Sequence, residues 1–222
     1  AGLVTRRRLA ADAWANARFR LRGSTDADAD ALRERISTSI AGAEVRQLRR
    51  LAPSVMAGVL PRLYPRMLEI AYEHQDAGRK AYIVTAASSE MAEAMAYVLQ
   101  FDGGIGYRSE IVDGVYTGRP EGPFTYREGK AAELRRLAEE EGIDLEESYA
   151  YSDSESDLPM LRAVGHPVAV NPDRTLARVA RQEGWPVIRL ERLGRWLKLG
   201  AAGAVAAATA GGAVVPRLGA RR

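Results

Sequence analysis

The chain has 222 residues, of which 46% are hydrophobic and 27% are charged, and it carries a formal net charge of +3 with a pI near 9.3. This composition is typical of a globular protein and excludes a disordered tail, and the length allows one core domain with a smaller one. There is no cysteine, which excludes disulfides, thiolate metal sites and cysteine nucleophiles and leaves the cytoplasm as the expected compartment. Arginines are spread along the chain rather than gathered in one basic block, so we expect no nucleic-acid partner.

The first 62 residues have the composition of a helical domain. Ala, Leu and Arg dominate from residue 5 onward, Ser24 or Thr25 can cap a helix, and Pro53 and Pro61 are expected to act as later stops. The sequence opens with Ala1 and shows no secretory signal, so a fragment, a trimmed product and a misplaced start are the alternatives. We expect residues 1–62 to form a small helical domain.

From residue 64 the pattern changes to helices alternating with short apolar strands. The expected elements are a helix over 64–77, a strand over 80–85, a helix over 89–101, a hairpin within 107–117 that turns at Asp113-Gly114, a helix over 127–141, a strand over 148–152, a short helix from 156, a strand over 167–170, a helix over 173–183 and a strand over 186–190. This order favours an α/β fold over residues 63–192, with a mostly parallel sheet covered by helices on both faces. Such sheets bind ligands at the carboxyl ends of their strands, which places the expected chemistry just after Thr85 and Ser152.

The last segment, residues 193–222, has a different composition. Leu199 to Val215 carry no charge and are mostly Ala, Gly and Val, with arginine or lysine on both sides. A run of this length is at the lower limit for a bilayer span, and Ala and Gly contribute little transfer energy. The alternatives are a membrane-associated helix, which would tether the protein to a membrane, and a peripheral low-complexity tail.

Two acids follow the expected strand over 148–152. Asp153 and Asp157 are four residues apart, and small serines between them leave room for a ligand. Carboxylates at the carboxyl end of a strand provide hard oxygen ligands suited to Mg²⁺. The alternative is a capped helix start, in which Asp153 or Ser154 accepts hydrogen bonds from backbone N–H groups.

A second candidate site follows the expected strand over 80–85. Thr85 and Ala86 lead through small residues into a helix, and the hydroxyl and N–H groups there can hold a phosphate. The alternative is N-capping by Ser88 or Ser89. Lys130 lies near the start of the helix over 127–141, where the helix dipole disfavours a cation, so we expect a function for it unless it is simply solvated.

In this order and on these elements, the motifs resemble the haloacid dehalogenase superfamily. The strongest resemblance is to phosphoserine-phosphatase-like hydrolases of bacterial subfamily IB, through YSDS followed by DLPML within 151–161, AVGHP at 163–167, AVNPD at 169–173 and GWPV at 184–187. The resemblance covers residues 64 to 190. It implies a Rossmann-like three-layer sandwich with a helical cap of the C1 type, for which residues 1–62 are the candidate segment.

The resemblance also implies a reaction, the hydrolysis of a small phosphorylated metabolite through a phospho-aspartate intermediate with one Mg²⁺. By this resemblance Thr85 and Ala86 would bind the phosphoryl oxygens, and Lys130 would neutralise phosphate and nucleophile. Asp153 would hold the metal, directly or through water, and Asp157 would fix Lys130 or the water shell of the metal. Lys130 and Asp157 are thus the catalytic candidates.

The first motif of the family, a strand ending in DxDx(T/V), has no counterpart in the sequence. Asp26, Asp28 and Asp30 have the right spacing, but they follow a polar run and lie in a helical region, so we assign them no catalytic role. We therefore expect the N-terminal strand to be missing and the chain as given to be inactive as a phosphatase. The alternative function is a catalytically inactive protein that binds phosphate and Mg²⁺ or acts as a membrane-tethered interaction partner.

Overall fold

The computed structural model describes residues 33, 34 and 36–190. The chain divides into two compact units, Ala1–Arg189 and Leu190–Arg222, and the description below concerns the first unit. The predicted tail over 193–222 and most of the predicted helical cap lie outside the described residues. The predicted boundaries between cap, core and tail therefore stay a prediction.

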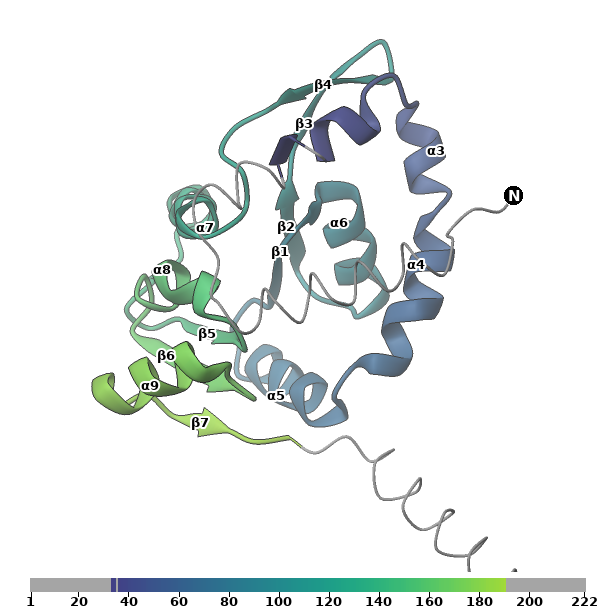
Figure 1. Cartoon of the computed structure of the whole chain (residues 1–222). Coiled ribbons are helices and arrows are strands. Elements are labelled where there is room, and N and C mark those ends of the chain that lie inside the picture. Colours follow the sequence, from purple (N-terminus) through teal and green to yellow (C-terminus); the bar gives the residue numbers. More distant parts are fainter. Residues whose placement is uncertain (1–32, 35, 191–222) are drawn as a thin grey trace, which may run out of the picture. The chain divides into compact units, whose positions relative to one another are not determined.

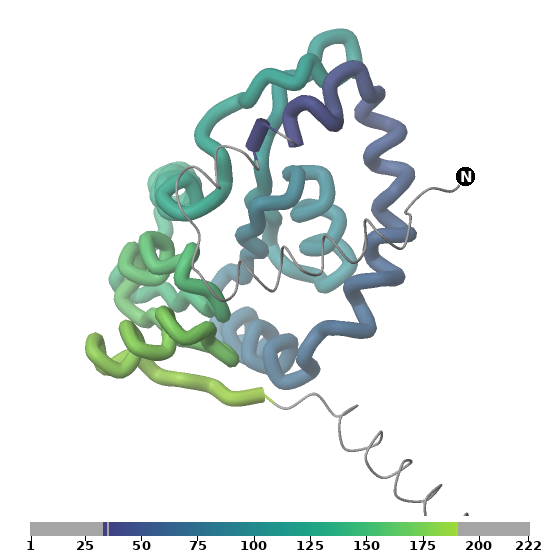
Figure 2. The backbone as a smooth tube through the Cα atoms, in the orientation of Figure 1, coloured from purple at the N-terminus to yellow at the C-terminus, as the bar shows by residue number. Residues whose placement is uncertain are grey.

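The described part of the N-terminal region is helical, as predicted. Residues 36–40 are helical and are followed by α3 (Val45–Arg49), α4 (Ala52–Val59), η1 (Leu60–Arg62) and α5 (Pro65–Asp76). α3 ends shortly before Pro53 and α4 shortly before Pro61, so the predicted helix stops are confirmed. The two prolines themselves lie in the first turns of α4 and η1. The first-turn N–H groups of a helix have no partner within the helix, so a proline costs no hydrogen bond there. Figure 2 shows the path of α3 and α4 past α6 (Ser89–Val98).

A β-hairpin follows in the chain and joins the helical segment. Strands β3 (Ser109–Val112) and β4 (Val115–Pro120) are antiparallel, and the turn residues Asp113 and Gly114 have φ of 52° and 76°. Two positive φ angles are what a type I′ hairpin turn requires, so the predicted turn is confirmed. On its other side β4 exchanges backbone hydrogen bonds with residues 42–45, where Gly42 N donates to Tyr116 O at 2.8 Å. This pairing ties the start of the helical segment to the hairpin.

Two parallel strands, β1 (Tyr82–Ser88) and β2 (Gly103–Tyr107), form the first of two parallel sheets. The sequence did not predict β2, because three of its five residues are glycines, which strand statistics disfavour. Their role is close packing against α6. A Cβ at Gly104 would lie 2.3 Å from the Ala92 carbonyl group, and one at Gly106 would lie 2.6 Å from that of Ser88.

The second parallel sheet follows with the order β5 (Tyr149–Ser152), β6 (His166–Val170) and β7 (Val187–Ile188). The helical elements α7 (Glu128–Glu141), η2 (Glu155–Asp157), α8 (Leu158–Leu161) and α9 (Arg174–Glu183) accompany it (Figure 1). A hydrophobic core forms between sheet and helices from seven buried residues: Ala150, Met160, Leu161, Val164, Ala169, Leu176 and Ala180. The predicted helices and strands of this half are confirmed within a few residues.

The two parallel sheets are not joined by hydrogen bonds within the described residues. Val84 of β1 packs against the core cluster that contains Ala150 of β5, yet β1 pairs only with β2, and β5 only with β6. No residue of β1 is fully buried. The predicted parallel pairing is therefore confirmed, but the described strands form two sheets, since none of them pairs with the remaining edges of β1 and β5.

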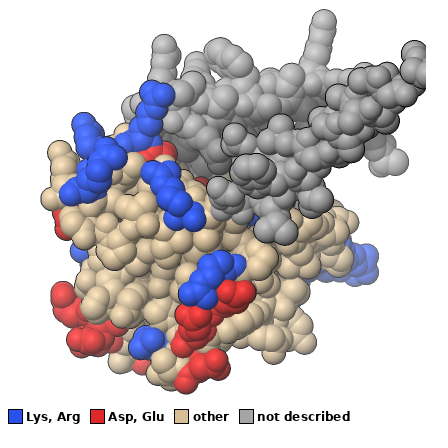
Figure 3. Space-filling model, turned by 90° about the horizontal axis from the view of Figure 1, so that it is seen from below, with Lys and Arg blue, Asp and Glu red and all other residues tan. Residues whose placement is uncertain are grey.

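No helix in the ranges that the structure describes is long and apolar enough to cross a bilayer. On the face drawn in Figure 3, acidic side chains gather beside basic ones, so this face has no continuous basic surface. The predictions of no nucleic-acid partner and of a cytoplasmic location stay predictions.

His74 at the end of α5 is held in its neutral form by two neighbours. Arg79 Nε donates to its Nδ1 at 2.8 Å, which leaves Nε2–H to face Tyr151 Oη at 2.7 Å. Burial lowers the pKa of His74, Arg79 lowers it further, and Glu73 opposes them. The Tyr149 ring lies 4.6 Å from the imidazole and stacks on His166 on its other side.

The close packing of α6 on β2 predicts that one added methyl group in β2 strongly lowers the stability of the protein. Gly104→Ala should lower the free energy of unfolding by about 3 kcal/mol, because the new Cβ meets backbone atoms that cannot rotate away. Gly58→Ala in α4 is the matched control, because the new Cβ would meet nothing within 4 Å. This substitution should stabilise the protein by up to about 1 kcal/mol. Urea unfolding measures both, and equal effects would contradict the packing argument.

The lowered pKa of His74 predicts that the protein loses stability as the pH falls. The pKa of its side chain is lower in the folded than in the unfolded state, so below about 6.5 the unfolded chain binds a proton that the folded chain refuses. The contribution of His74 is complete above that pH and is lost as the pH falls toward the folded-state pKa. His74→Gln stays neutral and can still donate to Tyr151, so it should flatten the slope of unfolding free energy between pH 7 and pH 5. A slope unaffected by His74→Gln would refute this account.

Candidate active site

Lys130 and Asp157 form an ion pair that is almost completely buried. Lys130 Nζ lies 2.7 Å from Asp157 Oδ1, and the side chains keep 11% and 10% of their exposure. Lys130 is in the first turn of α7, and Asp157 ends η2, close after β5. Asp157 Oδ2 accepts a hydrogen bond from Ser152 Oγ at 2.7 Å. The structure thus brings both catalytic candidates together, and Asp157 holds Lys130.

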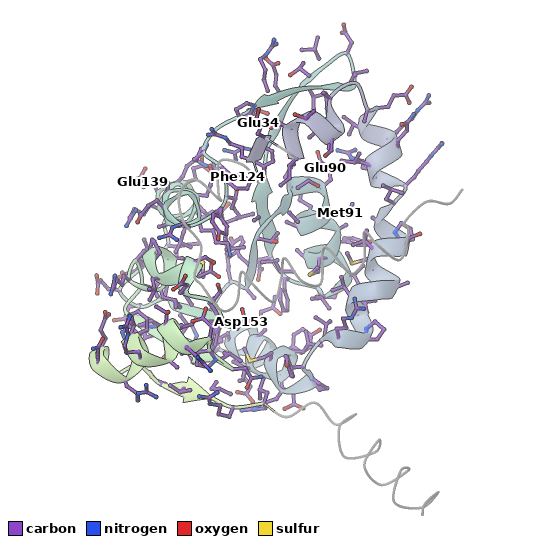
Figure 4. The ribbon with its side chains drawn as sticks, viewed as in Figure 1. Glu34, Glu90, Met91, Phe124, Glu139 and Asp153 are labelled. Carbon is purple, nitrogen blue, oxygen red and sulfur yellow. The ribbon has the colours of Figure 1, made fainter. Side chains whose placement is uncertain are left out.

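Asp153 lies where β5 ends and is exposed (Figure 4). Its carboxylate makes no hydrogen bond or ion pair with the described residues. The capping alternative holds for its neighbour, because Ser154 is the N-cap of η2 and its Oγ accepts from Ser156 N. Asp153 is therefore not a helix cap, and its carboxylate oxygens are available to a ligand.

Thr85 lies within β1 rather than at its end, and the strand continues to Ser88 with an irregular register after Val84. Thr85 Oγ1 accepts from Ala87 N at 3.1 Å, so one of the predicted free N–H groups is occupied. Ser88 is the residue at the N-cap position of α6, but its hydroxyl makes no capping bond and is buried without a partner. The capping alternative at Ser88 is not realised, and the phosphate role of Thr85 and Ala86 stays a prediction.

The described residues contain no group of three or more acidic, histidine or cysteine side chains that would hold a metal ion. They do fit part of a magnesium site, since Asp153 offers free hard oxygen atoms at the end of a strand. Mg²⁺ is typically held by one or two protein carboxylates, with water and substrate phosphate completing its shell. The oxygens of Asp157 are engaged by Lys130 and Ser152, so Asp157 is less suited to bind a metal directly.

Two further contacts near these elements were missed by the sequence reasoning. Tyr116 of β4 donates its hydroxyl proton to Glu90, which lies in the first turn of α6 (Figure 4). Burial is the main reason why the pKa of the Tyr116 hydroxyl is raised, and the bond to Glu90 raises it further. Asp173 caps α9 and also accepts from Glu155 N at 2.7 Å. The position of Asp173 at the start of the predicted helix over 173–183 is a local signal for a cap, whereas no local pattern signals a contact between β4 and α6.

The buried pair predicts that its two members depend on each other. Lys130→Met leaves Asp157 charged and buried, so the free energy of unfolding should fall by about 3–5 kcal/mol. The double variant Lys130→Met with Asp157→Leu should cost less than the sum of the single changes. Lys80→Met, which removes the exposed Lys80–Glu141 pair, should have little effect in the same urea titrations. Additive costs of the two single changes would mean that the pair is not coupled.

Comparison with protein families matches residues 1–162 to the model of the haloacid dehalogenase-like hydrolases. "Probable phosphatase Rv3661" of Mycobacterium tuberculosis is 36% identical over 192 residues, which are 86% of this chain and 67% of that protein. "Phosphoserine phosphatase SerB1" of the same organism is 35% identical over 203 residues, 90% of this chain and 66% of that protein. The chain therefore spans about two thirds of the length of these relatives.

A solved structure shares the fold. A protein of unknown function from Bordetella pertussis is 31% identical, with 78% of both chains covered and a TM-score of 0.66. The family match and this likeness confirm the predicted family and the α/β fold class. The chain belongs to the haloacid dehalogenase-like hydrolase family.

Proposed function

We propose that this chain provides the phosphate-binding and charge-neutralising part of a phosphomonoesterase that acts on a small phosphorylated metabolite. The observation that carries the proposal is the buried Lys130–Asp157 pair, together with the exposed Asp153, which directly follows β5 and makes no hydrogen bond or ion pair with the described residues. The predicted enzyme class, a phosphatase of this family, agrees with the names of the two mycobacterial relatives. Substrate identity stays open, because a fold hosts many substrates.

Lys130 is the cation of the proposed site. Its ammonium group is held by Asp157, which is in turn held by Ser152, so the charge stays in one place without reorganisation. A fixed cation stabilises the negative charge that develops on a transferring phosphoryl group. Thr85, with the N–H of Ala86, is proposed to bind the remaining phosphoryl oxygens.

A divalent metal ion is the proposed cofactor, and Mg²⁺ is the specific choice because Asp153 offers oxygen ligands only. The metal would neutralise phosphate charge when bound. Asp153 would hold it through its free carboxylate, and Asp157 would keep Lys130 away from that carboxylate. The nearby serines are small and leave the end of β5 open to a ligand.

The covalent step requires an aspartate that the described residues do not place at the site. We propose that it is carried by a further strand between the unpaired edges of β1 and β5, with the sequence DxDx(T/V) at its end. Its first aspartate attacks phosphorus and the bond to the substrate oxygen breaks, while the second aspartate protonates the leaving oxygen. Water then hydrolyses the phospho-aspartate and releases inorganic phosphate.

The alternative of an inactive binding protein or a membrane-tethered partner has no support in the described residues or in the relatives. No helix in the described residues is suited to cross a bilayer, and both mycobacterial relatives are named as phosphatases. Membrane association through residues 193–222 stays a prediction.

The proposal is tested with two forms of the protein and p-nitrophenyl phosphate as a general substrate. The chain as given should show no turnover above background, because a cation and a metal without a nucleophile cannot form the covalent intermediate. A form preceded by an apolar strand ending in DxDxT should hydrolyse the substrate in Mg²⁺ and lose activity in EDTA.

Asp153→Asn in the extended form should lower kcat/KM by about 10²–10³-fold, the cost of losing one charge contact to a transition state. Asp144→Asn, in the exposed loop before β5, is the matched control and should retain full activity. Metal-dependent hydrolysis by the chain as given, persisting in Asp153→Asn, would overturn both the proposed metal ligand and the proposed strand.

A further inference from the structure

We propose that Asp173 is a positioning residue that fixes the loop carrying Asp153, by tying that loop to the N-terminus of α9. The metal-binding consequence rests on the proposed function, whereas the tie itself is a property of the fold. Asp173 lies twenty residues after Asp153, between β6 and α9.

Asp173 joins the two segments through three hydrogen bonds. Its backbone N donates to Asp153 O at 2.8 Å, and its Oδ2 accepts from Glu155 N at 2.7 Å. Its Oδ1 accepts from Leu176 N at 2.8 Å, which caps α9. Both carboxylate oxygens are therefore used, one toward the helix and one toward the loop.

A helix cap alone does not explain this arrangement. Capping requires one acceptor, and Ser, Thr or Asn provide it as well as Asp. The second oxygen of Asp173 bonds to a residue eighteen positions earlier in the sequence. The carboxylate of Asp173 does both with separate oxygens, which a side chain with a single acceptor atom cannot do, and this is the physical reason for an aspartate here.

The tie determines where the Asp153 carboxylate stands. No described residue forms a hydrogen bond or ion pair with that side chain, so within this part of the chain its direction depends on the backbone of residues 153–155. The backbone is held on one side by Asp173 and on the other by Ser152, whose Oγ accepts from Ser154 N at 3.2 Å. Outer contacts of this kind orient metal ligands without touching the metal.

Helix α9 is a firm base for such a tie. Leu176 and Ala180 on its inner face are completely buried in the core cluster with Leu161. The loop is thereby fastened to the core of the second sheet rather than to another loop. A metal-binding side chain that is already held in place by a rigid element loses less conformational entropy when the metal binds.

The test separates the tie from the cap. Asp173→Ser keeps an N-cap for α9 and removes the acceptor for Glu155 N. Glu155→Pro removes the donor of the same bond; Glu155 begins η2, and Ser154 has extended backbone angles, so a proline fits there. Asp144→Ser is the control, because it makes the same exchange of aspartate for serine in an exposed loop elsewhere, where the carboxylate accepts a hydrogen bond from Glu146 N.

In the full chain, hydrogen exchange by NMR should show faster exchange of the Ser154 and Ser156 amides in both Asp173→Ser and Glu155→Pro, with the Leu176 amide still protected. Titration with Mg²⁺ alone, followed by calorimetry, should give a Kd about 10–100-fold higher in both variants. Asp144→Ser should leave exchange and Kd unchanged.

Unchanged exchange in both variants would overturn the inference, as would faster exchange with an unchanged Kd for Mg²⁺. If the parent chain binds no Mg²⁺, the proposed metal site fails, and the exchange data then decide the tie by themselves. Faster exchange in that case supports the tie, and unchanged exchange rejects it.

Discussion

The buried contact between Lys130 and Asp157 is the constraint on which the arrangement of the site depends. Placing two charges out of water is favourable only when their remaining hydrogen-bonding groups are satisfied. Asp157 meets this condition through the hydroxyl of Ser152, so three residues from α7, η2 and β5 must stay in register. A shift of α7 along the second sheet would separate Lys130 from Asp157 and leave a buried charge unpaired.

The second sheet and its helices support the candidate site residues, which lie at one edge of this part of the fold. The core cluster fixes α8 and α9 against β5 and β6, and α7 adds Leu134 to it. Asp153 and Asp173 are then placed by backbone bonds that start from this core. The first sheet, with α6 packed closely on Gly104 and Gly106, offers a second support on which Thr85 stands. The residues proposed to bind phosphate and metal thus come from both sheets, each with its own packing contacts.

Sequence reasoning found the elements whose patterns are local. The helix over 127–141 and the turn at Asp113-Gly114 follow from amphipathic spacing and from turn chemistry. Strand β2 was not predicted, because its glycines are explained only by their packing against α6, a contact that the local sequence does not reveal. The pairing of Lys130 with Asp157 was expected from family resemblance, since nothing in the spacing of two residues 27 positions apart predicts an ion pair. The second role of Asp173 could not be predicted, because a helix cap is a sufficient local reason for an aspartate and its bond to Glu155 N depends on the fold.

One edge of β1 and one edge of β5 pair with no strand in the part of the chain that the structure describes, which has a practical consequence for handling the protein. A row of free backbone N–H and C=O groups can recruit a strand from a neighbouring molecule, and short apolar strands such as YIVT in β1 favour it. We expect the chain to self-associate during concentration more readily than a protein whose sheet is closed. Low temperature storage and dilute refolding are therefore advisable, and light scattering during concentration gives an early warning of edge-to-edge aggregation.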